Sequence, residues 1–410
     1  MKERRWLFAT ILLAILARLP LLLTPGYDVR GYKVWARGVW EVGLGRAYAQ
    51  PFPDPGGPYH YSPLFLYSLR VVGIVYSALR PDGTWEDQLL ATLIKLPASM
   101  AELLLGLLIW RFLCARVGAR VALGATAAYL LNPALIWNTA YWGSIDILHA
   151  LPTLAALIAT EFGASGAAGA LAALALGSKL TALPGLLALT PPFLRAPRRL
   201  LWAIVGALCT LGVLILPIIV QGQIGSLIRA LFGNVGLYPA ASANAHNLWW
   251  LVTGGQGTRP DTTILFAGVD YRRAGFLLFT LFTVGIGIRL WRQGADLALP
   301  FVASALLSFA FCMLTTEVHE NWFYPLFAPL LIAAALDRRY RALYLAVSLT
   351  FLANLALHDP PLFALLGDGI LAPARALRML NTIAQCAILL WWTWGFFRPS
   401  STWKNPRAQI

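Results

Sequence analysis

The first 31 residues, MKERRWLFATILLAILARLPLLLTPGYDVRG (1–31), carry the pattern that decides the fold. The basic segment MKERR precedes a long apolar run from Trp6 to Leu23, and the acidic residue Asp28 follows almost at once. This run is about as long as a helix that crosses a bilayer. It lacks a small-residue cleavage site, so we expect it to be retained as a first transmembrane helix and not removed as a signal peptide.

The rest of the chain repeats such apolar runs. Of its 410 residues, 59% are hydrophobic and 12% are charged, whereas soluble domains are about 45–50% apolar and about 25% charged. About a dozen runs are long enough to span a membrane. The sequence therefore predicts an all-α polytopic membrane protein that forms a single multi-pass domain over residues 1–410. Its cysteines lie far apart and show neither metal-ligand spacing nor a disulfide framework: Cys114, Cys209, Cys312 and Cys386.

The net charge of +14 does not indicate nucleic-acid binding, because the basic residues stand in short groups between apolar runs. Short loops rich in Arg and Lys stay in the cytoplasm. The basic groups are Arg111, Arg116 and Arg120; Arg195, Arg198 and Arg199; Arg289 and Arg292; Arg338, Arg339 and Arg341; and Arg398, Lys404 and Arg407. With MKERR inside, twelve crossings place both termini and all these groups in the cytoplasm.

The twelve crossings are predicted near 6–23, 89–113, 121–139, 145–162, 164–178, 180–194, 200–220, 274–290, 297–314, 322–336, 342–357 and 381–397. Segments 24–88, 221–273 and 358–380 then form long external loops. Residues 59–79 are apolar enough to span, but a crossing there would reverse the arginine pattern. We therefore expect an interfacial or re-entrant helix within the first external loop.

The titratable residues follow the same division. Most of the carboxylates and every histidine fall on the external side: His60, His149, His246, His319 and His358. The segment TTEVHENWFYP (315–325) places two carboxylates and a histidine at the mouth of a span, where ionisable groups indicate a functional site. The alternative is an interfacial loop in which Trp322 and Tyr324 are aromatic belt residues.

Several motifs recur in one order along the chain. They are YDVRGYKVWARG (27–38), YHYSPLFLY (59–67), LIKLPASMAELLL (93–105), LLNPALIWNTAYWGSID (130–146), GSKLTALPG (177–185), NAHNLWWL (244–251) and VHENWFYPL (318–326). In this order and sidedness the chain resembles the GT-C glycosyltransferases, which use polyprenyl-phosphate sugars. It is most similar to the first mannosyltransferase of glycosylphosphatidylinositol synthesis and to the lipid-linked-oligosaccharide glucosyltransferases with their bacterial relatives.

The resemblance implies a GT-C bundle and an inverting transfer without metal or other cofactor. Asp28 is the candidate general base, and Arg30, Lys179 and His319 are candidates for binding the donor phosphate. The mannosyltransferase has a second acidic residue at the position of Arg30. Its HEK or HER triplet corresponds to His319-Glu320-Asn321, so Asn321 stands in place of the cation of the triplet. Simpler roles stay open: a helix N-cap for Asp28 and a snorkelling side chain for Lys179.

Candidates for contacts with the sugar or acceptor are Glu320, Asp146, His246, Trp249 and Tyr61. Asp146 could instead cap the helix that follows it, and His246 and Trp249 could be ordinary loop and belt residues. Mid-span polarity is expected only at Glu102, with Lys95 on the same helical face.

The expected reaction is transfer of a hexose, with mannose favoured and glucose next, to a lipid-linked or glycan acceptor on the external face of a prokaryotic inner membrane. The partners are membrane lipids, donor and acceptor, with the protein as a monomer and without nucleic acid. The alternatives are a transporter or flippase of a lipid-linked sugar, a polymerase or ligase that uses a diphosphate donor, and a non-catalytic subunit.

Overall fold

The computed structural model describes residues 2–50, 59–233, 235–292, 296–367 and 371–398. It is 77% helical, which confirms the predicted all-α class. Within the described ranges its strands form one antiparallel hairpin, from β1 (Ile264–Phe266) and β2 (Val269–Asp270). Lys404 and Arg407 of the last basic group lie outside the described residues.

The first half of the chain contains, in order, α1 (Lys2–Leu22), α2 (Val29–Val42), η1 (Ala47–Ala49), α3 (Pro63–Leu79), α4 (Gln88–Val117), α5 (Ala119–Leu130), α6 (Pro133–Ile136), η2 (Trp137–Tyr141), α7 (Ile147–Glu161), α8 (Ser165–Ser178), η3 (Leu180–Ala182), α9 (Leu183–Leu186), η4 (Leu187–Leu189), α10 (Thr190–Leu194) and α11 (Pro197–Val220).

The second half contains α12 (Ile224–Phe232), α13 (Leu248–Val252), the hairpin, α14 (Tyr271–Arg292), α15 (Leu299–Leu314), η5 (Glu320–Leu326), α16 (Phe327–Leu336), η6 (Arg338–Tyr340), α17 (Arg341–Ala356), α18 (Pro360–Leu366) and α19 (Leu371–Phe397).

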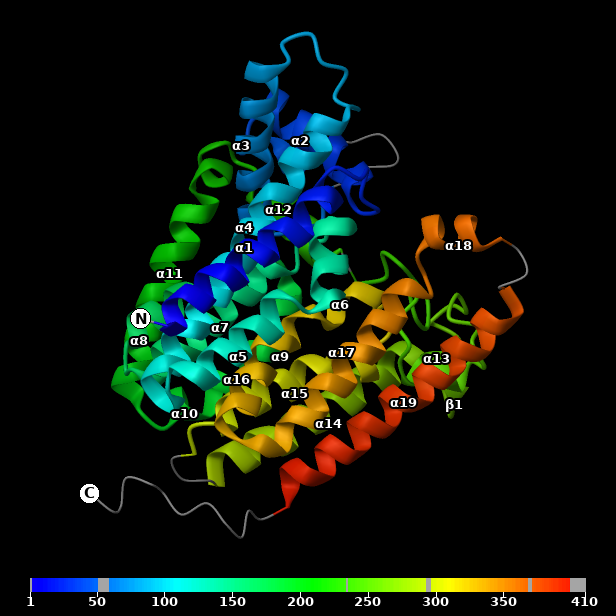
Figure 1. The fold of residues 1–410 in the computed structure, drawn as a ribbon. Coiled ribbons are helices and arrows are strands. Elements are labelled where there is room, and N and C mark those ends of the chain that lie inside the picture. Colours follow the sequence, from blue (N-terminus) through cyan, green and yellow to red (C-terminus); the bar gives the residue numbers. More distant parts are fainter. Residues whose placement is uncertain (1, 51–58, 234, 293–295, 368–370, 399–410) are drawn as a thin grey trace.

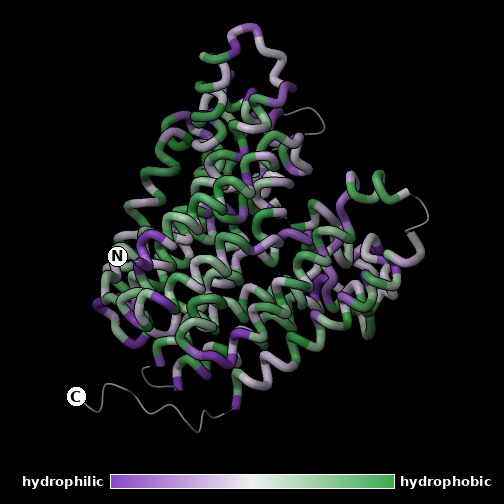
Figure 2. The backbone as a smooth tube through the Cα atoms, viewed as in Figure 1, coloured by the Kyte–Doolittle hydropathy of each residue, from purple (hydrophilic) through white to green (hydrophobic). Residues whose placement is uncertain are grey.

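The main core surrounds α15 and α16, which run through the middle of the bundle (Figure 1). Nearly every residue of both helices is buried, whereas α1, α11 and α14 expose most of their apolar side chains. Hydrophobic residues follow the helices over most of their length, and hydrophilic ones gather mainly at their ends and in the loops (Figure 2). An apolar exterior around a buried centre is the arrangement expected of a bundle embedded in lipid.

The first loop has a small core of its own, formed by α2, α3 and the start of α4. These helices project beyond the bundle at the top of Figure 1. Arg70, an unexpected charge within the apolar segment 59–79, donates from Nη1 to the backbone carbonyl oxygens of Val39 and Trp40 at the C-terminal end of α2. A cation at the end of a helix satisfies its free carbonyl groups. Whether α3 lies at a membrane surface stays a prediction.

One predicted span is broken in the structure, and another changes between 3₁₀ and α-helix along its length. The span expected over 121–139 ends at Leu130, and a bend of 42° separates α5 from the continuation at Pro133. The Asn132 side chain accepts a hydrogen bond from Ala134 N (3.0 Å), and Pro133 occupies the first helical position, so a new helix starts here. The segment expected over 180–194 consists of η3, α9, η4 and α10 in succession.

Other boundaries also differ from those expected. The span predicted over 322–336 begins as the 3₁₀ segment η5 and becomes α-helical only at Phe327. The last helix begins at Leu371, so the loop 358–380 contains α18 and the first turns of α19.

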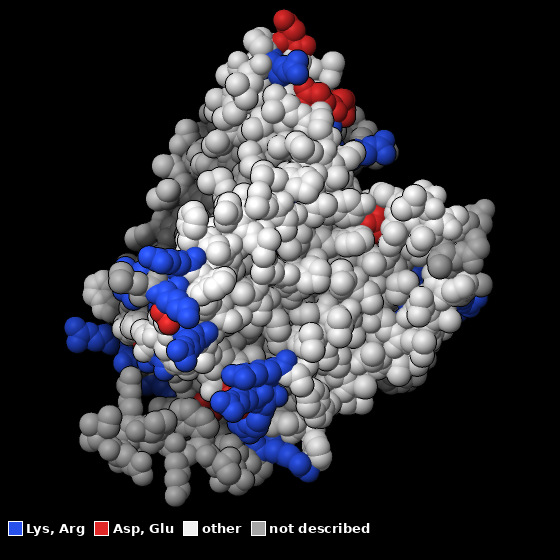
Figure 3. Space-filling model, in the orientation of Figure 1, with Lys and Arg blue, Asp and Glu red and all other residues white. Residues whose placement is uncertain are grey.

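The number of membrane crossings is not settled by helix length. Among the described residues, four helices are long and apolar enough to cross a membrane, or up to six if each bent pair counts as one span, and five further apolar helices are shorter. Lys and Arg gather at the lower left of the face shown in Figure 3, and acidic residues gather at its top, beyond α3. This separation fits the predicted orientation, which remains a prediction together with the twelve crossings.

Candidate active site

Asp28 lies in the turn between α1 and α2, directly before α2. Its backbone N–H donates to the carbonyl oxygen of Trp142 (3.0 Å), and its carboxylate accepts a hydrogen bond from Asn321 Nδ2 (3.2 Å). The side chain makes no capping hydrogen bond to α2, although it occupies the N-cap position. Capping therefore does not explain why a carboxylate stands here.

Lys95 on α4 holds the turn that presents Asp28. Its Nζ donates to the carbonyl oxygens of Leu21 (3.0 Å) and Thr24 (2.8 Å) and to Thr24 Oγ1 (3.0 Å). Gly26 has φ +77°, and a Cβ there would lie 2.6 Å from Lys95 Cε. Glycine is thus required by both the backbone conformation and the close approach of the lysine.

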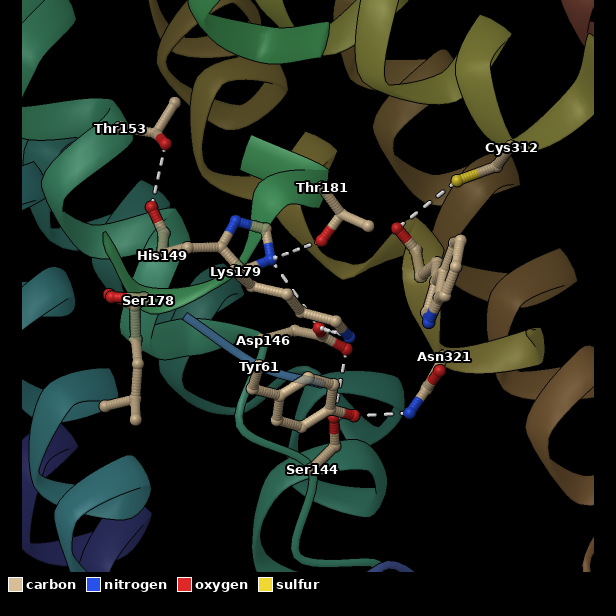
Figure 4. A network of polar contacts seen from close by, with 12 residues as sticks. Tyr61, Ser144, Asp146, His149, Thr153, Ser178, Lys179, Thr181, Cys312 and Asn321 are labelled. Atoms are coloured by element: carbon tan, nitrogen blue, oxygen red, sulfur yellow. Dashed lines mark hydrogen bonds and ion pairs between the residues drawn. The ribbon is translucent and has the colours of Figure 1, made fainter. Parts of the chain in front are cut away.

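Asp146 and Lys179 form a buried ion pair. Lys179 Nζ lies 2.6 Å from Asp146 Oδ1, and both side chains are almost completely buried. Asp146 also accepts from Ser144 Oγ (2.9 Å), and His149 Nε2 lies 3.5 Å from its Oδ1. Asp146 makes no capping hydrogen bond to α7, so neither capping for Asp146 nor snorkelling for Lys179 describes the structure. Figure 4 shows the pair beside Tyr61, with His149 and Thr181 above it in this view.

Asn321 joins the two carboxylates into one site. Its Nδ2 lies 3.2 Å from Asp28 Oδ2 and 3.4 Å from Ser144 Oγ, which in turn bonds Asp146. Sequence reasoning treated Asn321 only as a missing cation and did not single out Ser144. Residues of η5, of the turn after α1 and of the segment before α7 thus meet at one point.

A cavity of about 490 Å³ opens beside this network. Its polar wall includes Asp28, Tyr61, Lys179, His319 and Asn321. The lining also contains apolar residues, called here the apolar wall: Leu180, Leu183, Pro184, Leu231, Val235, Leu237, Phe276, Phe279 and Phe311. The predicted site residues Asp28, Tyr61, Lys179 and His319 are therefore brought together, although they come from four separate parts of the chain.

Aromatic rings flank the Lys179 ammonium group. It lies 5.4 Å from the ring centre of Tyr61 and 5.3 Å from that of Trp322, within range of cation–π attraction. His319 lies at the same wall, with its ring edge-on to Tyr238 at 4.6 Å. Burial, followed by the positive charge of Lys179, lowers the pKa of His319 to about 4, so His319 is neutral at pH 7.

Burial raises the pKa of Asp28 to about 7, and the negative charge of Asp146 adds to this increase. Lys179 and the hydrogen bond from Asn321 act in the opposite direction. A carboxylate with a pKa near the working pH can accept a proton from a substrate hydroxyl and release it again. Perturbed carboxylates of this kind cluster at functional sites.

Glu320 is adjacent to this site but does not line the cavity. It is 4% exposed, and its Oε2 has no hydrogen-bond partner within the described residues. Burial raises its pKa to about 8, with a smaller effect from Asp28, so the side chain is mostly protonated at pH 7. A protonated carboxyl group can donate a hydrogen bond as well as accept one.

Three predicted residues lie apart from the cavity. Arg30 is exposed on α2 and does not line it. His246 Nε2 lies 3.1 Å from His358 Nε2, and its Nδ1 is 2.7 Å from Asn381 Nδ2. Trp249 donates from Nε1 to the carbonyl oxygen of Leu314 (2.7 Å) at the end of α15.

Comparison with known proteins finds no matching family model and no matching curated protein. Among solved structures, the chain is similar to the crystal structure of ArnT from Cupriavidus metallidurans bound to undecaprenyl phosphate. The sequence identity is 17% and the TM-score is 0.54, and the match covers 95% of this chain and 78% of ArnT. At this identity the likeness shows the fold. The chain therefore has the same fold as ArnT, which agrees with the GT-C fold expected from its ordered motifs.

Proposed function

We propose that the protein is a membrane glycosyltransferase that moves a sugar from a polyprenyl-phosphate carrier to an acceptor hydroxyl group. The observation that carries the proposal is the cavity itself, because its lining combines Asp28 and Lys179 with a set of apolar side chains. ArnT, which has the same fold, was solved with undecaprenyl phosphate, and this supports a polyprenyl phosphate as the partner here.

Motif resemblance further favours a hexose, with mannose before glucose, and a lipid-linked or glycan acceptor. The grouping of the arginines favours an active site on the external face, and the high content of Ala, Leu and Arg favours a prokaryotic inner membrane. The protein is proposed to need neither metal nor other cofactor for the transfer.

Lys179 is the cation that this cavity offers to a phosphate. Asp146 fixes the ammonium group from behind at 2.6 Å, and the Tyr61 and Trp322 rings confine it from the sides. A cation preorganised in this way stabilises the charge that develops on a departing phosphate without having to rearrange. Neutral His319, on the same wall, adds a hydrogen-bond donor and no charge.

Asp28 is proposed to act as the base. In the proposed step its carboxylate takes the proton of the acceptor hydroxyl, the acceptor oxygen bonds to the anomeric carbon, and the bond from that carbon to the phosphate oxygen breaks. The phosphate leaves with the bonding electrons as polyprenyl phosphate. Attack opposite the leaving group inverts the anomeric centre.

The apolar wall suits the prenyl chain of the donor. Leu183, Phe276 and Phe279 line the cavity, and Leu183 and Phe276 are about half exposed. A second apolar hollow of about 360 Å³ lies further along the same helices, with Leu187 and Ile286 in its lining. Residues 276, 279, 283 and 286 follow one face of α14, so the two hollows share one helical stripe.

The remaining candidate residues have different proposed roles, which depend on where they lie relative to the cavity. Tyr61, with its ring at the polar wall, is proposed to contact the sugar, and Glu320 is proposed to support the same region from behind. Asp146 is proposed to hold Lys179 and not to contact the sugar directly. Arg30, His246 and Trp249 do not line the cavity and are left out of the proposed site. Asp146 and Glu320 do not line it either, but they are kept because Asp146 pairs with Lys179 and Glu320 interacts with Asp28.

The test uses purified protein in lipid nanodiscs with polyprenyl-phosphate-linked radiolabelled mannose, the corresponding glucose donor and a diphosphate-linked sugar, and membrane extract as acceptor. Transfer from a monophosphate donor, abolished in Asp28→Asn, is the expected result. Transfer only from the diphosphate donor would establish the polymerase or ligase instead. Movement of the intact lipid-linked sugar across liposomes, without transfer, would establish the flippase.

A further inference from the structure

A buried ion pair joins α1 to α4 inside the bundle. Arg18 Nε lies 2.8 Å from Glu102 Oε2, and the two residues are 2% and 0% exposed. Arg18 Nη1 also donates to the carbonyl oxygen of Leu130 on α5 (2.9 Å). Charges inside a membrane bundle are costly to bury, and those that occur are paired and often functional. The hydropathy of the first apolar run concealed Arg18 from sequence reasoning.

The other oxygen of Glu102 reaches the segment that carries the candidate active site. Glu102 Oε1 accepts a hydrogen bond from Tyr324 Oη (2.7 Å), and Tyr324 Oη lies 2.9 Å from Tyr129 Oη on α5. Tyr324 belongs to η5, three residues after Asn321. In a 3₁₀ segment, residues i and i+3 lie one turn apart, so fixing Tyr324 also fixes the position of Asn321.

We propose that Glu102 is a positioning residue of the transfer reaction, because through Tyr324 it sets η5 so that Asn321 reaches Asp28. The catalytic meaning of this inference rests on the proposed function, but the mechanical link does not. Arg18 neutralises Glu102 and ties it to α1, and Asp28 stands in the turn at the end of α1. Both partners of the Asn321–Asp28 hydrogen bond are thus held by elements that meet at Glu102.

The link has a measurable consequence for Asp28. The hydrogen bond from Asn321 stabilises the ionised carboxylate and lowers its pKa against the effect of burial. If η5 shifts, this hydrogen bond is lost and the pKa of Asp28 rises. Two other titratable groups that face Asp28 are linked to η5, because Glu320 belongs to it and Lys179 lies against the Trp322 ring. The remaining groups are Asp146, Tyr27, Tyr32, Tyr61 and Tyr238.

The variant that tests the link is Tyr324→Phe, which removes the hydroxyl group and keeps the ring. Tyr344→Phe is the matched control: Tyr344 is also buried and its hydroxyl also bonds twice, to Asn132 and to the Ala128 carbonyl, but not to Glu102. Replacing Glu102 alone would leave Arg18 buried without a counter-charge and would endanger folding. The double variant Arg18→Leu/Glu102→Leu removes both charges together and serves as the second test.

The readout is carbodiimide labelling of Asp28 against pH, because the reagent modifies protonated carboxyl groups and mass spectrometry separates Asp28 from Glu320. We expect the labelling midpoint of Asp28 to rise by about one pH unit in Tyr324→Phe and in the double variant, and to stay unchanged in Tyr344→Phe. The acid limb of the kcat/KM profile should move to higher pH by the same amount in the test variants. Their kcat/KM should therefore be about 10-fold lower at pH 6 and should recover at higher pH.

An unchanged midpoint in both folded test variants would overturn the inference and leave the network with a purely structural role. A wild-type protein that transfers no sugar would refute the proposed function only, since the labelling experiment decides the link without any activity.

Discussion

Replacing Asp28 with asparagine separates its charge from its contacts. The backbone N–H of residue 28 still donates to Trp142, and the amide oxygen can still accept from Asn321. Since Asp28 makes no capping hydrogen bond, the start of α2 loses nothing. The folded structure should therefore persist, while a general base contributes about 10²–10⁴-fold to a rate, equivalent to about 3–5 kcal/mol.

The pKa of Asp28, about 7, fixes the shape of the wild-type pH profile. A base works only when it is ionised, so kcat/KM should rise with pH and level off above about pH 7. About one tenth of the Asp28 side chains are ionised at pH 6 and about one hundredth at pH 5, so kcat/KM should fall about tenfold with each unit.

The assay is initial-rate transfer in nanodiscs from pH 5 to pH 9, with thermal unfolding measured in parallel. Asp82→Asn is the control, because Asp82 is an exposed aspartate in the same loop, beyond α3. Turnover of Asp28→Asn within a few-fold of wild type would refute the assignment of Asp28 as the base. A persisting acid limb near pH 7 in that variant would show that a different group titrates.

Three further predictions concern other parts of the site and the membrane topology. Lys179→Met should lower the free energy of unfolding by about 3–5 kcal/mol, because it leaves Asp146 charged and buried without a partner. The double variant Lys179→Met/Asp146→Asn should regain most of this stability but remain about 10²-fold less active. Equal stability of the two variants in chemical unfolding would contradict the ion pair. Lys95→Met removes three hydrogen bonds from the turn before Asp28. It should therefore lower kcat about tenfold or more with little change in the KM for the donor. A change in KM alone would contradict this positioning role. In a cysteine-free background, Arg198→Cys and Asp82→Cys should react with a membrane-impermeant maleimide from opposite sides; labelling from one side would overturn the predicted orientation.

The candidate site was largely visible in the sequence because its charged members stand where apolar runs end. Asp28 follows a predicted span, Asp146 stands at the start of one and Lys179 lies between two, and such positions favour function over lipid contact. The local sequence pattern could not show that these residues lie close together in the folded protein. Asn321 bonds Asp28 across 293 positions of the chain, and its amide carries no signal of its own.

Some of the differences had a signal that was present but weak. Asn132-Pro133 predicts a helix boundary, since a residue before proline avoids the helical region, yet the surrounding run is apolar enough to suggest one continuous span. Arg18 was hidden because hydropathy averaged over a whole run dilutes one charge. Its partner, Glu102, lies 84 positions away in the chain, so the sequence around either residue does not indicate the other.

The apolar wall of the cavity determines which measure of substrate concentration applies to this protein. Leu183, Val235 and Phe276 line the cavity and are about half exposed, so protein does not cover this apolar part of the lining. If the bundle is embedded in lipid as proposed, lipid chains can reach it. A lipid-borne substrate arriving there travels by two-dimensional diffusion within its leaflet. Its effective concentration is then a mole fraction of the surrounding lipid, and adding empty lipid at constant protein and donor should slow turnover by surface dilution.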